Sequence, residues 1–250
     1  MHGACPSVVT PFRAGLYTPV VTALFIMVAS AGLVAASAPP PFQPHPLSAF
    51  DRQKAQALLA TRLPCLGCHE LDGQGGRIGP SLDALHGRPA DFVYEMIRDP
   101  QTTAPGTIMP RVPMDSATLA LIASYLLDRA ATPAPEGWSR LVPESAGDPS
   151  APAVLYRRNC ALCHGTRGGG DGANARFLPV RPTAHADSAL MADRTDDELF
   201  DTIFAGGYIM NRSNRMPPFG QTLTRTQIWA LVHYLRTLCR CEQPAWARGS

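Results

Sequence analysis

Lysine is almost absent from this chain. Lys54 is the only lysine among 22 basic residues, and the others are arginines. A docking face built from a ring of lysines is therefore excluded, whereas pairing of arginines with carboxylates is still open. The formal net charge is only +2, because 20 acidic residues nearly balance the basic ones. This charge is too small to favour nucleic acid as a partner.

The chain also lacks strand patterns around its glycine-rich and cysteine-rich stretches. Residues 168–172 read Gly-Gly-Gly-Asp-Gly, and such loops bind phosphate when they follow a strand and open a helix. The sequence predicts no strand before this loop, so a phosphate site is not favoured. A thioredoxin-like role for a Cys-x-x-Cys pair would likewise need a βαβ unit, which the sequence does not predict.

One motif is present twice. Cys65-Leu-Gly-Cys68-His69 and Cys160-Ala-Leu-Cys163-His164 both read Cys-x-x-Cys-His, which is the attachment signal for c-type haem. Two thiols at this spacing lie about one helical turn apart and can both add to the vinyl groups on one edge of a porphyrin. The histidine that follows then presents an imidazole nitrogen to the iron.

Each motif is followed by a methionine that precedes a proline, Met109 in the first case and Met216 in the second. A methionine thioether is a common second axial ligand in electron carriers, where it raises the reduction potential. Met114 is the alternative to Met109. Structural zinc could also bind two cysteine pairs, but these pairs are far apart in the sequence, and zinc does not explain the histidine after each pair.

With these residues in view, the chain resembles a di-haem class I c-type cytochrome, with two mono-haem domains in tandem. The resemblance rests on Cys65–His69, Gly79-Pro80, Met109-Pro110, Cys160–His164, Gly168–Gly172 and Met216–Gly220. It implies an all-α fold in which each helical domain surrounds one covalent haem, which would supply much of the core that so small a domain lacks. It also implies that the Pro80 carbonyl accepts the second ring N–H of His69, although an ordinary turn at Pro80 is equally open.

The expected organisation has six segments: 1–38, a signal peptide or membrane anchor; 39–47, a proline-rich spacer; 48–130, the first domain; 131–151, a linker; 152–241, the second domain; and 242–250, a tail. Residues 16–38 carry no charge and are long enough to span a bilayer. Ala36-Ser37-Ala38 also fits a signal-peptidase site. Either reading places the rest of the chain outside the cytoplasm, and the resemblance implies the bacterial periplasm.

Helix boundaries follow from capping patterns. Ser48 with Asp51, and Thr224 with Gln227, have the spacing of a capping box, and they predict helices from about 49 to 62 and from 225 onward. The other expected helices begin near 89, 115, 152 and 195, and the one at 152 is expected to run to about 163. In the last helix the apolar residues that predict a buried face are Ile228, Leu231, Val232, Leu235 and Leu238.

The resemblance implies a function in electron transfer, with two haem c groups, no catalytic residue, and redox proteins or a membrane respiratory complex as partners. A di-haem enzyme of the peroxidase or thiosulfate-oxidising type is the alternative, and it would need an open iron position. His185 and His233 are candidates only as alternative iron ligands. Cys239 and Cys241 could bond to each other, bond to a partner chain, or stay free.

Overall fold

Side-chain caps begin the main helices where the sequence predicts them. Ser48 and Asp51 form the expected capping box at the start of α1 (Ala49–Thr61). Thr224 and Gln227 do the same at the start of α10 (Arg225–Cys239). In both, the cap hydroxyl accepts the backbone N–H three residues on, and the acceptor side chain there receives the cap's own N–H. The two predicted capping boxes are therefore confirmed.

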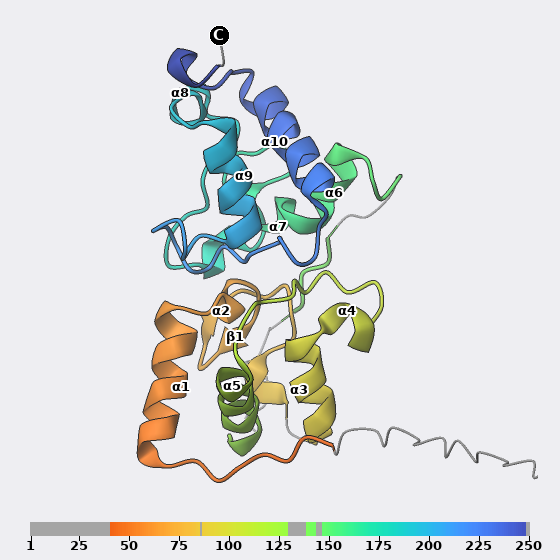
Figure 1. Cartoon of the computed structure of the whole chain (residues 1–250), viewed down its shortest axis with the longest axis vertical. Coiled ribbons are helices and arrows are strands. Elements are labelled where there is room, and N and C mark those ends of the chain that lie inside the picture. Colours follow the sequence, from red (N-terminus) through yellow and green to blue (C-terminus); the bar gives the residue numbers. More distant parts are fainter. Residues whose placement is uncertain (1–40, 86, 130–138, 144–146, 249–250) are drawn as a thin grey trace, which may run out of the picture. The chain divides into compact units, whose positions relative to one another are not determined.

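The computed structural model describes residues 41–85, 87–129, 139–143 and 147–248 (Figure 1). The predicted signal or anchor segment lies outside the described residues, as does most of the predicted linker. Residues from Pro40 onward cluster as one compact unit. In the described part of the chain, no helix is long and apolar enough to cross a membrane.

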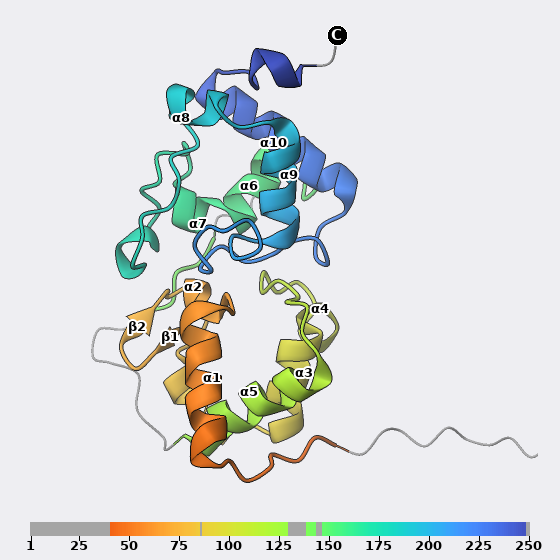
Figure 2. The ribbon, with the colours of Figure 1, turned by 60° about the vertical axis from the view of Figure 1, so that its left-hand side comes forward.

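We call residues 41–129 the first half. Its elements are α1, α2 (Cys65–Cys68), β1 (Glu70–Leu71), β2 (Gln74–Gly75), the 3-10 turn η1 (Leu82–Ala84), α3 (Ala90–Arg98), α4 (Pro100–Thr103) and α5 (Ser116–Asp128). α5 packs against both α1 and α3 (Figure 2). The two short strands form an antiparallel hairpin directly after the first haem motif. The fold is all-α in character, as the sequence predicts.

We call residues 147–248 the second half. Its elements are α6 (Pro152–Asn159), α7 (Ala161–His164), the 3-10 turn η2 (Ala175–Phe177), α8 (Ser188–Ala192), α9 (Asp196–Ala205), α10 and the 3-10 turn η3 (Ala245–Ala247). α10 packs against α6 and α9. Thr195 caps α9 through the Glu198 N–H, and Gly206 ends that helix with a φ of 82°, which a glycine adopts without strain.

The helix predicted from 152 to 163 is wrong in one respect, because it breaks at Cys160. This residue, with φ −119° and ψ −39°, ends α6 and begins α7. The break separates the helix that packs on α10 from the short turn that carries Cys163 and His164. The motif thus forms a separate turn and does not continue the axis of α6.

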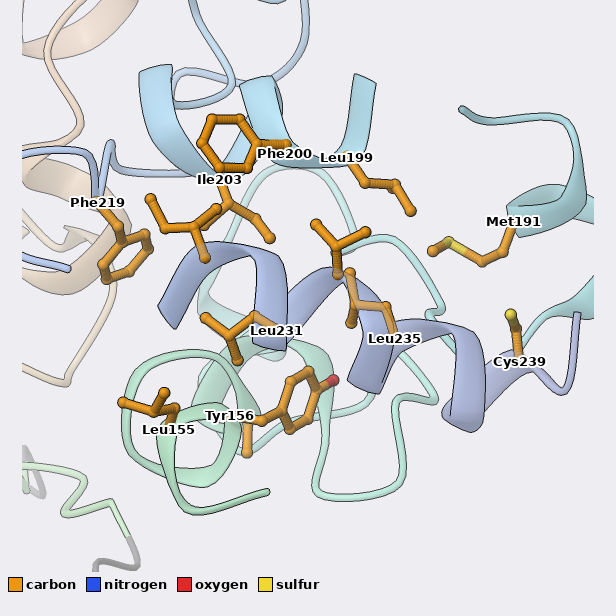
Figure 3. Close-up of a cluster of buried hydrophobic side chains, with 13 residues drawn as sticks. Leu155, Tyr156, Met191, Leu199, Phe200, Ile203, Phe219, Leu231, Leu235 and Cys239 are labelled. Atoms are coloured by element: carbon orange, nitrogen blue, oxygen red, sulfur yellow. The ribbon is translucent and has the colours of Figure 1, made fainter. Parts of the chain in front are cut away.

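Each half has its own hydrophobic cluster. In the first half, Leu59 of α1 meets Ile122 and Leu126 of α5. In the second half, Tyr156 of α6 lies beside Leu231 and Leu235 of α10, with α9 on the other side (Figure 3). Four of the five apolar positions predicted for α10 are buried, and Leu238 is partly buried against the same cluster.

The Thr224 cap gives a stability prediction. Replacing Thr224 with Ala leaves the first-turn N–H of Gln227 without its acceptor, and loss of such a cap costs about 1 kcal/mol. We expect a lower denaturation midpoint for the second half. Thr226→Ala, at an exposed position in the same first turn, is the matched control and should not destabilise. Equal midpoints for the two variants would contradict a capping role.

Candidate haem-binding sites

Both Cys-x-x-Cys-His motifs line one cavity of about 940 Å³. Its walls contain the predicted site residues of both halves: Cys65, Cys68, His69, Pro80, Met109, Cys160, Cys163, His164 and Met216. Most of the remaining wall is apolar and comes from the helices of the two halves, for example Val93 and Ile122 in the first half and Leu199 and Leu235 in the second. The fold therefore brings together every residue that the sequence singles out for haem.

In the first half, the ring of His69 is fixed by a backbone carbonyl. Its Nδ1 lies 2.7 Å from the Pro80 oxygen. A carbonyl can only accept, so Nδ1 carries the proton and Nε2 is left free to bind a metal. A Cβ at Gly79 would overlap this ring, so glycine is needed there. Burial lowers the pKa of His69, against the opposing effect of the bond to Pro80, which favours the neutral imidazole that a metal requires.

The second half repeats this arrangement with a different partner. His164 Nδ1 lies 2.9 Å from the Thr183 oxygen, so Nε2 is again the free nitrogen. Burial lowers the pKa of His164 as well. No sequence motif singled out Thr183, which lies far from His164 along the chain, and only the folded loop after Gly172 shows the contact.

The contacts of His185 are not predicted by the sequence. Its ring stacks on His164, with centroids 4.0 Å apart and planes 14° from parallel. Its Nδ1 is hydrogen-bonded to the Tyr156 hydroxyl at 3.0 Å. His185 thus packs against His164 and is held by Tyr156 of the second-half core. His233 is exposed on α10, and its nearest ring contact is Trp229, at 6.4 Å between centroids.

None of the four cysteines of the two motifs is paired in a disulfide. Burial raises the pKa of Cys65 to about 11 and that of Cys160 to about 12. Burial also raises the pKa of Cys68 and Cys163.

The charge distribution in the cavity suits a ring that carries carboxylates. Among the described residues that line it there is no Asp or Glu. Seven arginines line it: Arg88, Arg140, Arg158, Arg181, Arg194, Arg212 and Arg215. Guanidinium groups pair well with carboxylates such as haem propionates. The thiols, neutral imidazoles, apolar walls and arginines therefore fit covalent haem, and the cysteines with His69 and His164 would hold it.

Five methionines line the cavity: Met96, Met109, Met114, Met191 and Met216. Met109 lines the first-half part of the cavity, and Met216 the second-half part. Met114 also lines the cavity and packs against the first-half core cluster, and Met216 packs in the same way against the second-half cluster. Trp229 and Tyr234 are not among the described residues that line the cavity; both pack on the second-half core.

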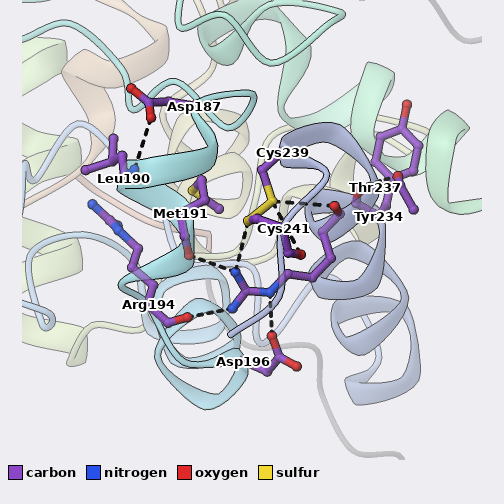
Figure 4. Close-up of a disulfide and its surroundings, with 10 residues drawn as sticks. Asp187, Leu190, Met191, Arg194, Asp196, Tyr234, Thr237, Cys239 and Cys241 are labelled. Atoms are coloured by element: carbon purple, nitrogen blue, oxygen red, sulfur yellow. Dashed lines mark hydrogen bonds and ion pairs between the residues drawn. A yellow bond between two sulfur atoms is a disulfide. The ribbon is translucent and has the colours of Figure 1, made fainter. Parts of the chain in front are cut away.

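Cys239 and Cys241 form a disulfide at the end of α10 (Figure 4). This contact settles a pairing that the sequence left open. Arg236 of α10 lies next to it and binds the Met191 and Arg194 carbonyls and the Asp196 carboxylate. The disulfide thus closes a small ring where α10 is joined to the segment carrying α8 and α9.

Comparison with known proteins supports the haem assignment in the second half. Residues 147–235 match the family model described as cytochrome c oxidase, cbb3-type, subunit III. No curated protein sequence matches the chain. A chain of the reducing HAO-like protein complex of Kuenenia stuttgartiensis is 19% identical, with 69% of this chain and 79% of that chain covered. Its TM-score of 0.30 is too low to inform fold or function. The family match and the Cys160–His164 motif support a c-type cytochrome domain at residues 147–235.

Proposed function

We propose that the chain is a di-haem electron carrier that relays single electrons between redox proteins outside the cytoplasm. The observation that carries this proposal is the shared cavity, which gathers two Cys-x-x-Cys-His motifs and a methionine from each half. Bound haem supplies one-electron chemistry at its iron. The match to a cbb3-type oxidase subunit supports a respiratory complex as partner.

The chain's own residues set the conditions for this chemistry. The Pro80 and Thr183 carbonyls orient His69 and His164, so that each imidazole would present Nε2 to the iron. Met109 and Met216 would supply thioethers, which raise the reduction potential and close the sixth position. The apolar walls exclude water, which also influences the potential.

The first test is haem stoichiometry. The exported holoprotein should carry two haems per chain by pyridine haemochrome analysis, and both should stay with the chain after acid–acetone extraction because thioether bonds are covalent. A value of one or none would contradict the two-site proposal.

The second test separates a carrier from an enzyme. The ferrous protein should bind carbon monoxide poorly at neutral pH, because a methionine would fill each sixth position. Soret spectra recorded during a carbon monoxide titration measure this directly. Met216→Ala, which opens one position, is the positive control. Rapid stoichiometric binding by the unaltered protein would favour a di-haem enzyme instead.

A further inference from the structure

Asn174 joins the two haem motifs to each other. Its backbone N–H donates to the Leu162 carbonyl at 2.8 Å, and its side-chain Nδ2 donates to the Gly67 carbonyl at 2.9 Å. Leu162 and Gly67 hold the same position in their motifs, directly before the second cysteine. One residue therefore binds equivalent carbonyls of both motifs.

The Asn174 side chain makes two further contacts. Asn174 Nδ2 also lies 3.3 Å from Cys163 Sγ, and Oδ1 accepts the Arg77 backbone N–H at 2.8 Å. Asn174 is fully buried, with no exposed surface. A buried amide costs free energy unless its donors and acceptor are paired. Here Nδ2 is paired with groups of both halves, and Oδ1 is paired with the first half.

The first motif packs closely against the second half. A Cβ at Gly67 would overlap the Arg215 carbonyl oxygen, and a Cβ at Gly76 would crowd the Asn174 amide. Arg215 immediately precedes Met216. The turn of the first motif is thus in direct contact with two segments of the second half: the one that contains Asn174 and the loop that would supply the second methionine.

Asn174 lies between the second cysteines of the two motifs. Its Nδ2 binds the carbonyl of Gly67, directly before Cys68, and lies 3.3 Å from Cys163 Sγ. Because Cys68 and Cys163 are attachment points, what fixes their separation also fixes how the two cofactors are anchored relative to each other.

We propose that Asn174 is a positioning residue that clamps the two haem-attachment motifs together, so that the two haems are coupled through their cysteine-bearing edges. This inference rests on the proposed di-haem function. The clamp does not create either haem site, because the second motif is held by backbone bonds within its own half, and the first has its own hairpin and the Pro80 contact. The Asn174 clamp instead sets the coupling between the two haems.

Circular dichroism in the Soret region tests the coupling, because two nearby haems in a fixed arrangement give a signal of two opposite signs. We expect this signal in the unaltered protein. Asn174→Ala should retain two haems per chain and lose most of the two-signed component. Gly67→Ala should have the same effect from the other side of the interface. Leu162 shows that this motif position accepts a side chain, so the attachment signal is preserved.

Asn214→Ala is the matched control. Asn214 also donates across the interface, to the Leu63 carbonyl at 3.0 Å, but it touches neither cysteine pair. It should keep the two-signed signal. A single-signed signal in the unaltered protein, retention in both Asn174→Ala and Gly67→Ala, or equal loss in Asn214→Ala would each overturn the inference. If the Asn174→Ala protein does not accumulate, the Soret circular dichroism spectra of Gly67→Ala and of the unaltered protein decide the test. Fewer than two haems per chain would instead refute the proposed function itself.

Discussion

Replacing Cys160 and Cys163 together with Ala should reduce the haem content from two per chain to one and unfold much of the second half. The reason lies in the position of the cavity. Residues of α9 and α10, such as Leu199, Ile203 and Leu231, line it while also belonging to the second-half core. Without covalent haem these side chains would surround a void, and a helical domain of about 90 residues has little other core to offset it.

Haem content and far-ultraviolet circular dichroism measure the two effects together. The matched control is Cys239→Ala with Cys241→Ala, which removes two cysteines of the same half but only a disulfide. A disulfide that closes so short a loop contributes little through chain entropy. The control should therefore keep two haems and native helix content. Two haems in the Cys160/Cys163 variant would show that the second motif is not an attachment site.

Local features of this structure could be predicted from the sequence because short-range physics determines them. A capping box depends on residues three positions apart, so Ser48 and Thr224 could be identified without a fold. The buried face of α10 follows from helical periodicity alone, as Ile228 and Val232 show. The Cys-x-x-Cys-His motifs are equally local, since attachment requires two thiols on one turn followed by a histidine.

Contacts between distant residues could not be predicted in this way. Asn174 and Gly67 are separated by 107 positions, and neither has a pattern that indicates the other. Thr183 was missed because any carbonyl can accept from His164, so residue type carries no signal. His185 was considered only as a ligand, whereas stacking on His164 depends on a loop conformation that spacing does not determine.

The break at Cys160 lies where local propensity is weak. Residues 152–158 include good helix formers such as Leu155 and Arg157, whereas Asn159 and Cys160 are among the poorer ones. Helix α6 ends and α7 begins at this point. A boundary near Cys160 therefore agrees with local propensity better than a helix that continues to 163.

Met109 is expected to be the axial ligand of the first haem, in preference to Met114. The sequence reason is that Met109 precedes Pro110, which favours an extended backbone. The structure adds that the Met109 backbone is held at both ends. Its N–H donates to Thr107 Oγ1 at 3.2 Å, and its carbonyl accepts from the Gln101 side chain. Its side chain lines the cavity from this fixed loop.

Met114 is placed differently, although it reaches the same cavity. It directly precedes Asp115, the cap of α5, and its side chain packs against the first-half core cluster. Met109→Ala should therefore halve the long-wavelength charge-transfer band of methionine-ligated ferric haem, since Met216 would account for the other half, and should lower the potential of the first haem. Met114→Ala should leave both unchanged and cost only stability, as loss of a partly buried methionine does. A redox titration followed at the charge-transfer band measures both the band intensity and the potential of the first haem. If the band halves in Met114→Ala and persists in Met109→Ala, Met114 is the ligand instead.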